Sequence, residues 1–450
     1  MLAINFLGLL GIAQASSLSI PFEKYELENG LDVILSEDHS VPFVQVNIWY
    51  NVGAKDENEG KTGFAHLFEH LMFQGSEHHD TEYFAPLQPI GARVNGTTNM
   101  DRTNYFEGVP SEYLPLALWL ESDRMGWLLP ALTEDKLSNQ KLVVRNERRQ
   151  SYEIRPYGEV WPWLYENLYP SDHPYHVPTI GKHEDIENAS MEDVVDFFKT
   201  WYVPNNASLV ICGDFDPETA KSLVEQYFGE IKRGPDPSPR VEASATLEDE
   251  KIVRKTDKVP HSKVWIAWLS PKLYGQGDAD LDILSTLLSD GKESLLYSKL
   301  VDELQIAKDI RAYQSSSRLQ SQYIIEATAA KGHTTDGLVT AIDEALASFK
   351  QTSSEDEALL NQISIAKDNW EARFYSGLQS IARKANQLNS YNILVGDPGY
   401  IEQDLQRYMD VTAQTLLQTT QTVLDPNRRV VLHVTPEPEE NDASSTPESE

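Results

Sequence analysis

Cysteine, long apolar stretches and basic charge are all scarce in this 450-residue chain. Its one cysteine, Cys212, cannot form an internal disulfide, so a disulfide scaffold and a thiolate zinc cluster are both excluded. We find no apolar run long enough to span a membrane. Lysine and arginine number 38 against 70 aspartates and glutamates, and the net charge of −32 argues against nucleic acid as a partner.

The two ends of the chain have the composition of segments outside a folded body. Residues 1–15 combine an apolar run with an Ala-Gln-Ala cleavage site, which is typical of a secretory signal peptide. Residues 436–450 are acidic, rich in proline and serine and free of aromatic side chains, which predicts a disordered tail. We therefore expect an exported, soluble protein of the periplasm.

Two patterns recur at a spacing of about 220 residues, which indicates an internal duplication. In one, Val-Pro precedes an alternating strand, and in the other, Pro-Asn separates a helix from an apolar strand. The copies are Val41-Pro42 with Val259-Pro260, and Pro204-Asn205 with Pro426-Asn427. The predicted fold class is α+β, with two homologous domains, each a mostly antiparallel sheet packed with helices.

A stretch rich in glycine and proline separates the two halves. We predict a linker at residues 232–250, between a first domain at 16–231 and a second at 251–435. Cys212 lies in an apolar run that predicts a buried strand of the first domain, where it would be a small core residue.

The segment from Phe64 to Phe73 carries the most informative pattern in the chain. His66, Glu69 and His70 form an H-x-x-E-H motif. Histidines four apart lie one turn apart on one helix face, so both imidazoles can reach one metal ion, and Glu69 can contact a water on that metal. The apolar neighbours predict a buried helix, in which polar side chains need a strong partner. The alternative is a pair of packed core histidines.

Two histidines leave a zinc site one protein ligand short. Glu147 is the best candidate, because Leu137, Gln140, Val144 and Glu147 follow the spacing of one inward helix face. Thr133 is a plausible N-cap of that helix. The alternative for Glu147 is a solvated side chain on a charged helix.

The H-x-x-E-H motif together with Glu147 resembles the pitrilysin-type (M16) zinc metallopeptidases. Residues 143–150 resemble the second metal-binding helix of that family, and residues 91–105 resemble a strand region beside its active site. Size and layout are similar to the short-chain branch, which includes mitochondrial processing peptidase and bacterial relatives. The resemblance implies Zn²⁺ as cofactor, with His66, His70 and Glu147 as metal ligands and Glu69 as the catalytic base.

A predicted strand at residues 94–98 is the expected substrate-binding element. An extended peptide would add to its edge, with Asn95 and Thr97 alternating with Gly96 and Thr98 along it. Ordinary core structure is the alternative for this strand. Shifting the metal motif by about 220 residues reaches a stretch without histidine, so the second domain is expected to serve structure or substrate gripping.

The chain departs from the family pattern at three positions. Many members carry a glutamate where this chain has Gln140, which is expected to tune the site without removing a ligand. The resemblance also implies an Arg and a Tyr from the second domain that stabilise the oxyanion, but Val301 and Lys308 occupy those positions. We therefore expect a sister subunit to supply the Arg/Tyr pair in a heterodimer, with a homodimer as the alternative.

Three functions are compatible with these residues. The first is a zinc-dependent endopeptidase or oligopeptidase, the catalytic subunit of a two-chain enzyme. The second is a non-catalytic assembly or chaperone-like subunit that retains a metal site. The third is a metal-dependent hydrolase of something other than peptides. The intact motif with Glu69 favours the first, because a decayed site is expected to lose one of these residues.

Overall fold

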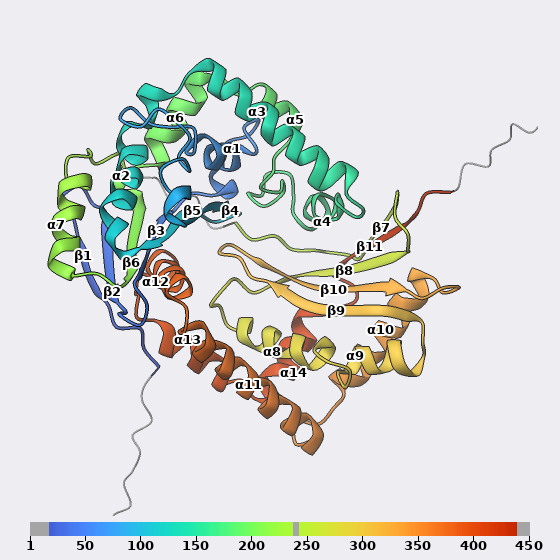
Figure 1. The fold of residues 1–450 in the computed structure, drawn as a ribbon. Coiled ribbons are helices and arrows are strands. Elements are labelled where there is room, and N and C mark those ends of the chain that lie inside the picture. The colour runs from blue at the N-terminus through green and yellow to red at the C-terminus, as the bar shows by residue number, and fades with distance from the viewer. Residues whose placement is uncertain (1–17, 237–242, 439–450) are drawn as a thin grey trace, which may run out of the picture.

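The computed structural model describes residues 18–236 and 243–438 and consists of two α+β halves that face each other (Figure 1). The predicted signal peptide, residues 237–242 of the predicted linker and residues 439–450 of the predicted tail lie outside the described residues. No helix in the described part is both long and apolar enough to cross a membrane.

The first half is built on a six-stranded sheet in the order β1-β2-β6-β3-β5-β4. Only the β2–β6 pair is parallel, and the other neighbours pair antiparallel. Strand β4 lies at one open edge. The strands are β1 (Glu23–Glu26), β2 (Asp32–Glu37), β3 (Phe43–Tyr50), β4 (Arg93–Thr98), β5 (Thr103–Pro110) and β6 (Ala207–Gly213).

The second half repeats this topology in a five-stranded sheet. Its order, β7-β11-β8-β10-β9, matches β2-β6-β3-β5-β4 strand for strand, including one parallel pair, β7 with β11. The repeated Val-Pro precedes β3 and β8, and the repeated Pro-Asn precedes β6 and β11, so both repeats fall at equivalent positions. The strands are β7 (Lys251–Asp257), β8 (Lys263–Ser270), β9 (Ala307–Ser315), β10 (Ser321–Ala329) and β11 (Val430–Pro436).

Helices cover the outer face of each sheet and bridge the two halves. Those of the first half are α1 (Phe64–Leu71), α2 (Leu114–Ala131), α3 (Glu134–Arg148), α4 (Val160–Leu168), α5 (His183–Glu187), α6 (Met191–Trp201) and α7 (Pro217–Phe228). Those of the second are α8 (Asp278–Ser289), α9 (Leu295–Tyr297), α10 (Thr335–Lys350), α11 (Glu357–Gly377), α12 (Ile381–Val395), α13 (Ile401–Met409) and α14 (Ala413–Val423).

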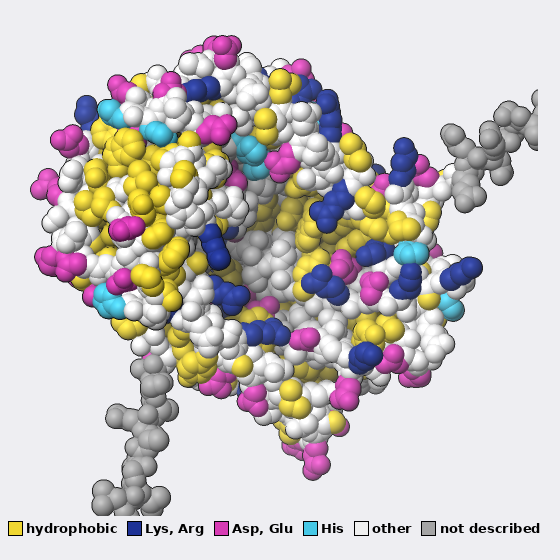
Figure 2. All heavy atoms as spheres, in the orientation of Figure 1, with side chains coloured by type: hydrophobic (Ala, Val, Ile, Leu, Met, Phe, Trp, Pro, Cys, Tyr) yellow, Lys and Arg dark blue, Asp and Glu magenta, His cyan; other side chains and the backbone are white. Residues whose placement is uncertain are grey.

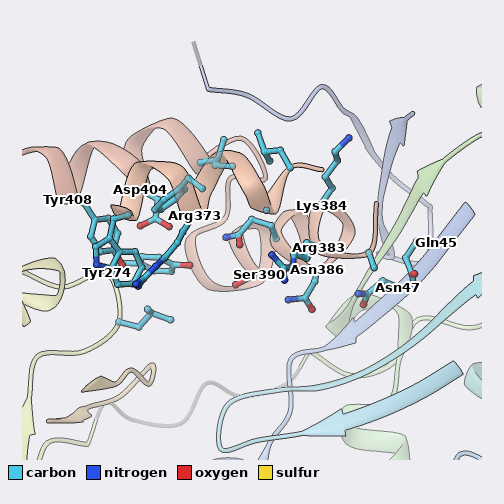
Figure 3. Close-up of a pocket in the computed structure, with 18 of the residues that line it drawn as sticks. Gln45, Asn47, Tyr274, Arg373, Arg383, Lys384, Asn386, Ser390, Asp404 and Tyr408 are labelled. Carbon is cyan, nitrogen blue, oxygen red and sulfur yellow. The ribbon is translucent and has the colours of Figure 1, made fainter. Parts of the chain in front are cut away.

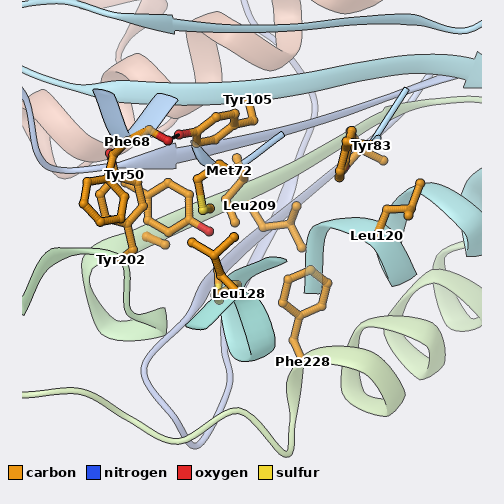
Figure 4. Close-up of a cluster of buried hydrophobic side chains, with 14 of the residues drawn as sticks. Tyr50, Phe68, Met72, Tyr83, Tyr105, Leu120, Leu128, Tyr202, Leu209 and Phe228 are labelled. Carbon is orange, nitrogen blue, oxygen red and sulfur yellow. Dashed lines mark hydrogen bonds between the residues drawn. The ribbon is translucent and has the colours of Figure 1, made fainter. Parts of the chain in front are cut away.

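The core of the first half holds the α1 helix against its sheet (Figure 4). Phe68 of α1 stacks on Tyr202, with ring centroids 4.9 Å apart, and Tyr202 contacts Tyr50 of β3 at 4.8 Å. The hydroxyl of Tyr105 on β5 donates to the Phe68 carbonyl oxygen at 3.4 Å. Truncating a buried phenylalanine such as Phe68 costs about 3–5 kcal/mol, so this packing fixes where the α1 side chains point.

The two halves exchange helices. Helix α12 of the second half packs on β3 and β6 of the first sheet, and α4 of the first half packs on β8 and β11 of the second. At the first contact Cys212 and Val210 meet Leu388 in one core, and the amide nitrogen of Asn389 donates to the Asn47 carbonyl oxygen at 2.8 Å. Cys212 is buried in β6, as its sequence context predicts.

The equivalent hairpin tips of the two sheets meet beside this exchange. Asp101, in the β4–β5 turn, accepts hydrogen bonds from the Tyr175 hydroxyl at 2.5 Å and from the backbone nitrogen of Arg318, in the β9–β10 turn, at 2.9 Å. The Arg318 guanidinium donates to Asn51 at 2.7 Å. Between the halves the surface is hollowed (Figure 2), and β4 lies on the side of the first half that faces this hollow.

Candidate metal centre

Helix α1 has one apolar face and one face that carries the polar side chains of the H-x-x-E-H motif. Phe64, Leu67, Phe68 and Leu71 recur at helical spacing and are buried in the first core. The carboxylate of Glu57 accepts hydrogen bonds from the backbone nitrogens of Gly63 and Ala65, both at 2.8 Å, and so caps the start of the helix. His66, Glu69 and His70 lie on the opposite face as a consequence.

Helix α3 brings Glu147 to the two histidines. It begins after Thr133, whose hydroxyl accepts from the backbone nitrogen of Lys136, so the predicted N-cap is confirmed. The Glu147 Oε2 atom lies 3.3 Å from His70 Nε2 and 3.7 Å from His66 Nε2. One ligand atom from each of the three residues falls within 4.8 Å of the others.

This geometry fits a zinc ion. Ligands about 2.0–2.1 Å from one tetrahedral zinc lie roughly 3.3–3.4 Å from each other, which is close to the two measured separations. Burial, followed by repulsion from His70, lowers the pKa of His66 to about 4, so its imidazole is in the neutral, metal-binding form. The hydrogen bond with His70 lowers the pKa of Glu147 and keeps that carboxylate ionised. The two distances to Glu147 and the charge states of His66 and Glu147 therefore fit a zinc ion.

Glu69 stands beside the triad and contacts the edge strand. Its Oε2 accepts a hydrogen bond from the Thr98 hydroxyl at 2.7 Å. Burial raises the pKa of Glu69, and the Thr98 hydrogen bond opposes that rise. A Cβ at Gly96 would lie 3.1 Å from the Glu69 Cγ and from ring atoms of Phe73 and Tyr105, so a larger residue there would require these side chains to shift.

The four predicted substrate-binding residues lie on two faces of β4. Gly96 and Thr98 face Glu69, whereas Asn95 and Thr97 face the opposite side because strand side chains alternate. The Thr97 hydroxyl donates to Asn104 at 2.5 Å, on the neighbouring strand. Among the described strands β4 pairs only with β5, so its other edge has no strand partner in that part of the chain.

Two contacts of this site were not predicted from the sequence. The first is the Thr98–Glu69 hydrogen bond, and the second is Arg102, which donates to the Thr97 carbonyl oxygen at 2.7 Å and lies 5.1 Å from the Trp49 ring centroid. Strand alternation could have placed Thr98 on the Glu69 face, but no local signal links Arg102 to the strand it supports.

The three departures from the family pattern have distinct surroundings. Gln140 is buried on α3, within the stripe that ends at Glu147. Val301 packs against the core of the second half, and Lys308 is exposed with its Nζ atom 2.7 Å from His261 Nε2. Among the described residues, no other group of three or more histidine, cysteine or acidic side chains could hold a metal ion.

Comparison with known proteins matches both halves. The model of the insulinase family, peptidase family M16, matches residues 32–169, and the model of the peptidase M16 inactive domain matches residues 188–363. The zinc protease PqqE of Helicobacter pylori is 27% identical over 413 residues, which cover 90% of each chain. The beta subunit of the mitochondrial-processing peptidase of Bos taurus is 27% identical over 205 residues, covering 45% of this chain and 41% of that one.

A solved structure shares the whole architecture. The crystal structure of a protease from Helicobacter pylori superposes with a TM-score of 0.84 at 26% identity, covering 93% of this chain and 100% of that one. The family resemblance is thereby confirmed, as is the α+β fold of two related halves. With family models on both halves and a ligand set on the first alone among the described residues, this chain belongs to peptidase family M16.

Proposed function

We propose that this chain is a zinc-dependent peptidase that cleaves peptides held along strand β4. The single observation that carries the proposal is the meeting of His66, His70 and Glu147 with a separate carboxylate, Glu69, that contacts the edge strand. A ligand triad alone would serve a structural metal. A fourth, hydrogen-bonded carboxylate beside an open edge is what hydrolysis requires.

Zinc, when bound, would polarise the scissile carbonyl and lower the pKa of a water to near 7. Glu69 takes the proton of that water and delivers it to the leaving nitrogen. Its raised pKa suits this exchange, because a base whose pKa lies closer to the working pH both accepts and releases a proton readily. Thr98 holds the carboxylate in place through its hydroxyl.

The open edge of β4 supports an extended peptide as the substrate. A peptide that adds to this edge would be bound by main-chain hydrogen bonds, and its side chains would alternate between the two faces. Gly96 lets β4 pack closely against Glu69, which places the base next to the strand that the peptide would join. Asn95 and Thr97 would line the side facing away from the metal triad.

A partner chain is part of the proposal. Val301 is packed into the second core and has no polar group, and Lys308 has its ammonium group at His261. Neither can replace the planar guanidinium and the phenol that stabilise the oxyanion in the family. We infer that a sister M16 subunit supplies them, and that this chain is exported to the periplasm, as the composition of residues 1–15 favours.

The test compares the chain alone with the chain plus its sister subunit. Zinc content, measured on the purified protein, is expected at about one ion per chain. Cleavage of a mixed peptide pool should be weak for the chain alone and strong for the pair, because one lost oxyanion donor costs about 3–4 kcal/mol. In the pair, Glu69→Gln should retain zinc and lose at least about a hundredfold in activity.

Each outcome separates the candidates. Full turnover by the chain alone would remove the partner from the proposal. A zinc-loaded pair that binds peptides without cleaving them would favour the non-catalytic subunit. Cleavage of non-peptide esters or amides, with no peptide cleaved, would favour the third function. Near-normal activity of the zinc-loaded Glu69→Gln pair would remove Glu69 from the role of base.

A further inference from the structure

A cavity separate from the metal centre opens between the first sheet and the helices α11, α12 and α13 (Figure 3). Its volume is about 620 Å³, and none of the metal triad lines it. Phe106 and Asn47 form part of its floor, and Trp370 and Tyr408 form an aromatic end. The cavity therefore combines residues of both halves at the helix exchange.

The other end of the cavity gathers free hydrogen-bond donors. In the described part of the chain, the Arg383 guanidinium and the Asn386 amide have no hydrogen bond or ion pair. Asn47 accepts from Asn104 and Asn389 at its Oδ1, both at 3.4 Å, which leaves its amide nitrogen free. Arg383, Asn386 and Asn47 line the same cavity, and Figure 3 shows them away from its aromatic end.

The remaining charges of the cavity are already neutralised. Arg373 pairs with Asp290 at 3.0 Å, and Lys384 pairs with Asp38. Asp404 accepts from Arg407 and from the Tyr391 hydroxyl, both at 2.7 Å. Arg383 is thus the cavity cation that lacks an acidic partner among the described residues. A planar guanidinium with two amide donors beside it is suited to a carboxylate.

The cavity lies within reach of a peptide on β4. Asn95 of β4 is directly opposite Phe106 of β5, and Phe106 is directly opposite Asn47 of β3. These three side chains form one row on the same sheet face, because paired residues point to the same side. Strands lie about 4.8 Å apart, so the row spans roughly 10 Å, and a peptide added at the free edge of β4 lies roughly 14 Å from Asn47, a distance that about four or five extended residues cover.

We propose that this cavity is a subsite for a carboxylate of the peptide substrate, bound by Arg383, Asn386 and Asn47. The carboxylate is either the C-terminus of the peptide or an Asp or Glu side chain a few residues beyond the scissile bond. An apolar side chain next to it would occupy the aromatic end at Trp370 and Tyr408. The proposal rests on the proposed peptidase function and adds the class of substrate.

The experiment measures binding, so that it does not depend on cleavage. Fluorescent peptides are titrated into the full chain carrying Glu69→Gln, and their dissociation constants are read by anisotropy. One peptide pair differs in a C-terminal carboxylate or amide, and a second, amidated pair differs in an internal Glu or Gln. In the peptide pair whose carboxylate member binds more tightly, Arg383→Gln in this background should weaken binding of the carboxylate peptide at least about tenfold. Binding of the neutral peptide of that pair should stay unchanged.

Two further variants serve as controls. Arg373 lines the same cavity, but it is already paired with Asp290. Arg373→Gln should therefore change the dissociation constants of the peptides by less than about twofold. Arg383→Lys keeps the positive charge but loses the planar guanidinium with its paired N–H donors, and should retain only part of the affinity for the carboxylate peptide. Both arginines are exposed, and unchanged melting curves would show that the variants fold.

The outcomes are decisive in both directions. A difference confined to the first peptide pair assigns the C-terminal carboxylate, and one confined to the second assigns an acidic side chain. Equal binding within both pairs, or equal losses in Arg383→Gln and Arg373→Gln, would overturn the subsite. If binding depends on the carboxylate but the wild-type pair of subunits cleaves no peptide, the proposed function is rejected and the subsite is kept. If the pair cleaves peptides but binding shows no carboxylate preference, the subsite is rejected and the proposed function is kept.

Discussion

Thr98→Val tests directly how the base is held. Valine keeps the β-branched shape that suits β4 and removes only the hydroxyl that donates to Glu69 at 2.7 Å. A hydrogen bond to a charged group contributes about 1.5–3 kcal/mol, and Glu69 is largely shielded from water that could replace it. If that bond orients the base in the transition state, kcat/KM should fall by about ten- to a hundredfold.

The neighbouring threonine provides a matched control. Thr97→Val is the same chemical change one residue earlier, but Thr97 points to the opposite face and donates to Asn104. It should change kcat/KM by less than about threefold. Peptide hydrolysis is measured in the assembly that turns over, with zinc content determined for each variant, and Thr98→Ser should restore most of the activity. Equal losses at both positions, or a zinc-loaded Thr98→Val enzyme with unchanged kcat/KM, would refute the reasoning.

Two further predictions concern the ligand triad and the second half. Glu147→Gln should weaken zinc binding by more than about a hundredfold, since losing even an outer-shell partner costs ten- to a hundredfold; unchanged affinity in a chelator competition would reject the third ligand. Burial raises the pKa of Asp282 from 3.8 to about 7, so its stabilising protonated form is lost as pH rises towards 7. Asp282→Asn, which still accepts from Tyr408, should therefore raise the free energy of unfolding about 2–3 kcal/mol more at pH 8 than at pH 5. Equal gains at both pH values, from urea denaturation, would contradict this.

Short-range patterns predicted much of the fold correctly. The apolar spacing around His66 and His70 predicted the buried helix α1, and the Thr133 cap with the stripe ending at Glu147 predicted α3. The family resemblance of residues 91–105 predicted the strand that is β4, and the repeated Pro pairs predicted a duplicated topology. These features depend on helix and strand periodicity, capping and turn chemistry, which act over a few residues.

Ligand identity had a different origin. Spacing alone left Glu147 open between a ligand and a solvated side chain, and the family resemblance favoured the ligand. The distances of 3.3 and 3.7 Å to the histidines arise where α1 and α3 pack against each other. Helix packing of this kind depends on side chains far apart in the sequence, so no local pattern could supply it. The role of Glu147 as a zinc ligand stays a prediction for the chelator experiment.

What the sequence determined by itself is therefore the two helices that carry the motif and Glu147, the repeated strands, and the side of the motif helix on which His66, Glu69 and His70 lie. Tertiary structure alone decided that α4 and α12 exchange sheets, that Thr98 holds Glu69, and that Arg383 lacks a counter-charge in a cavity shared by both halves. The physical reason is the same in each case. Periodicity and capping are local properties of the chain, whereas a contact between distant segments depends on how whole sheets and helices pack and on which polar groups that packing leaves without partners.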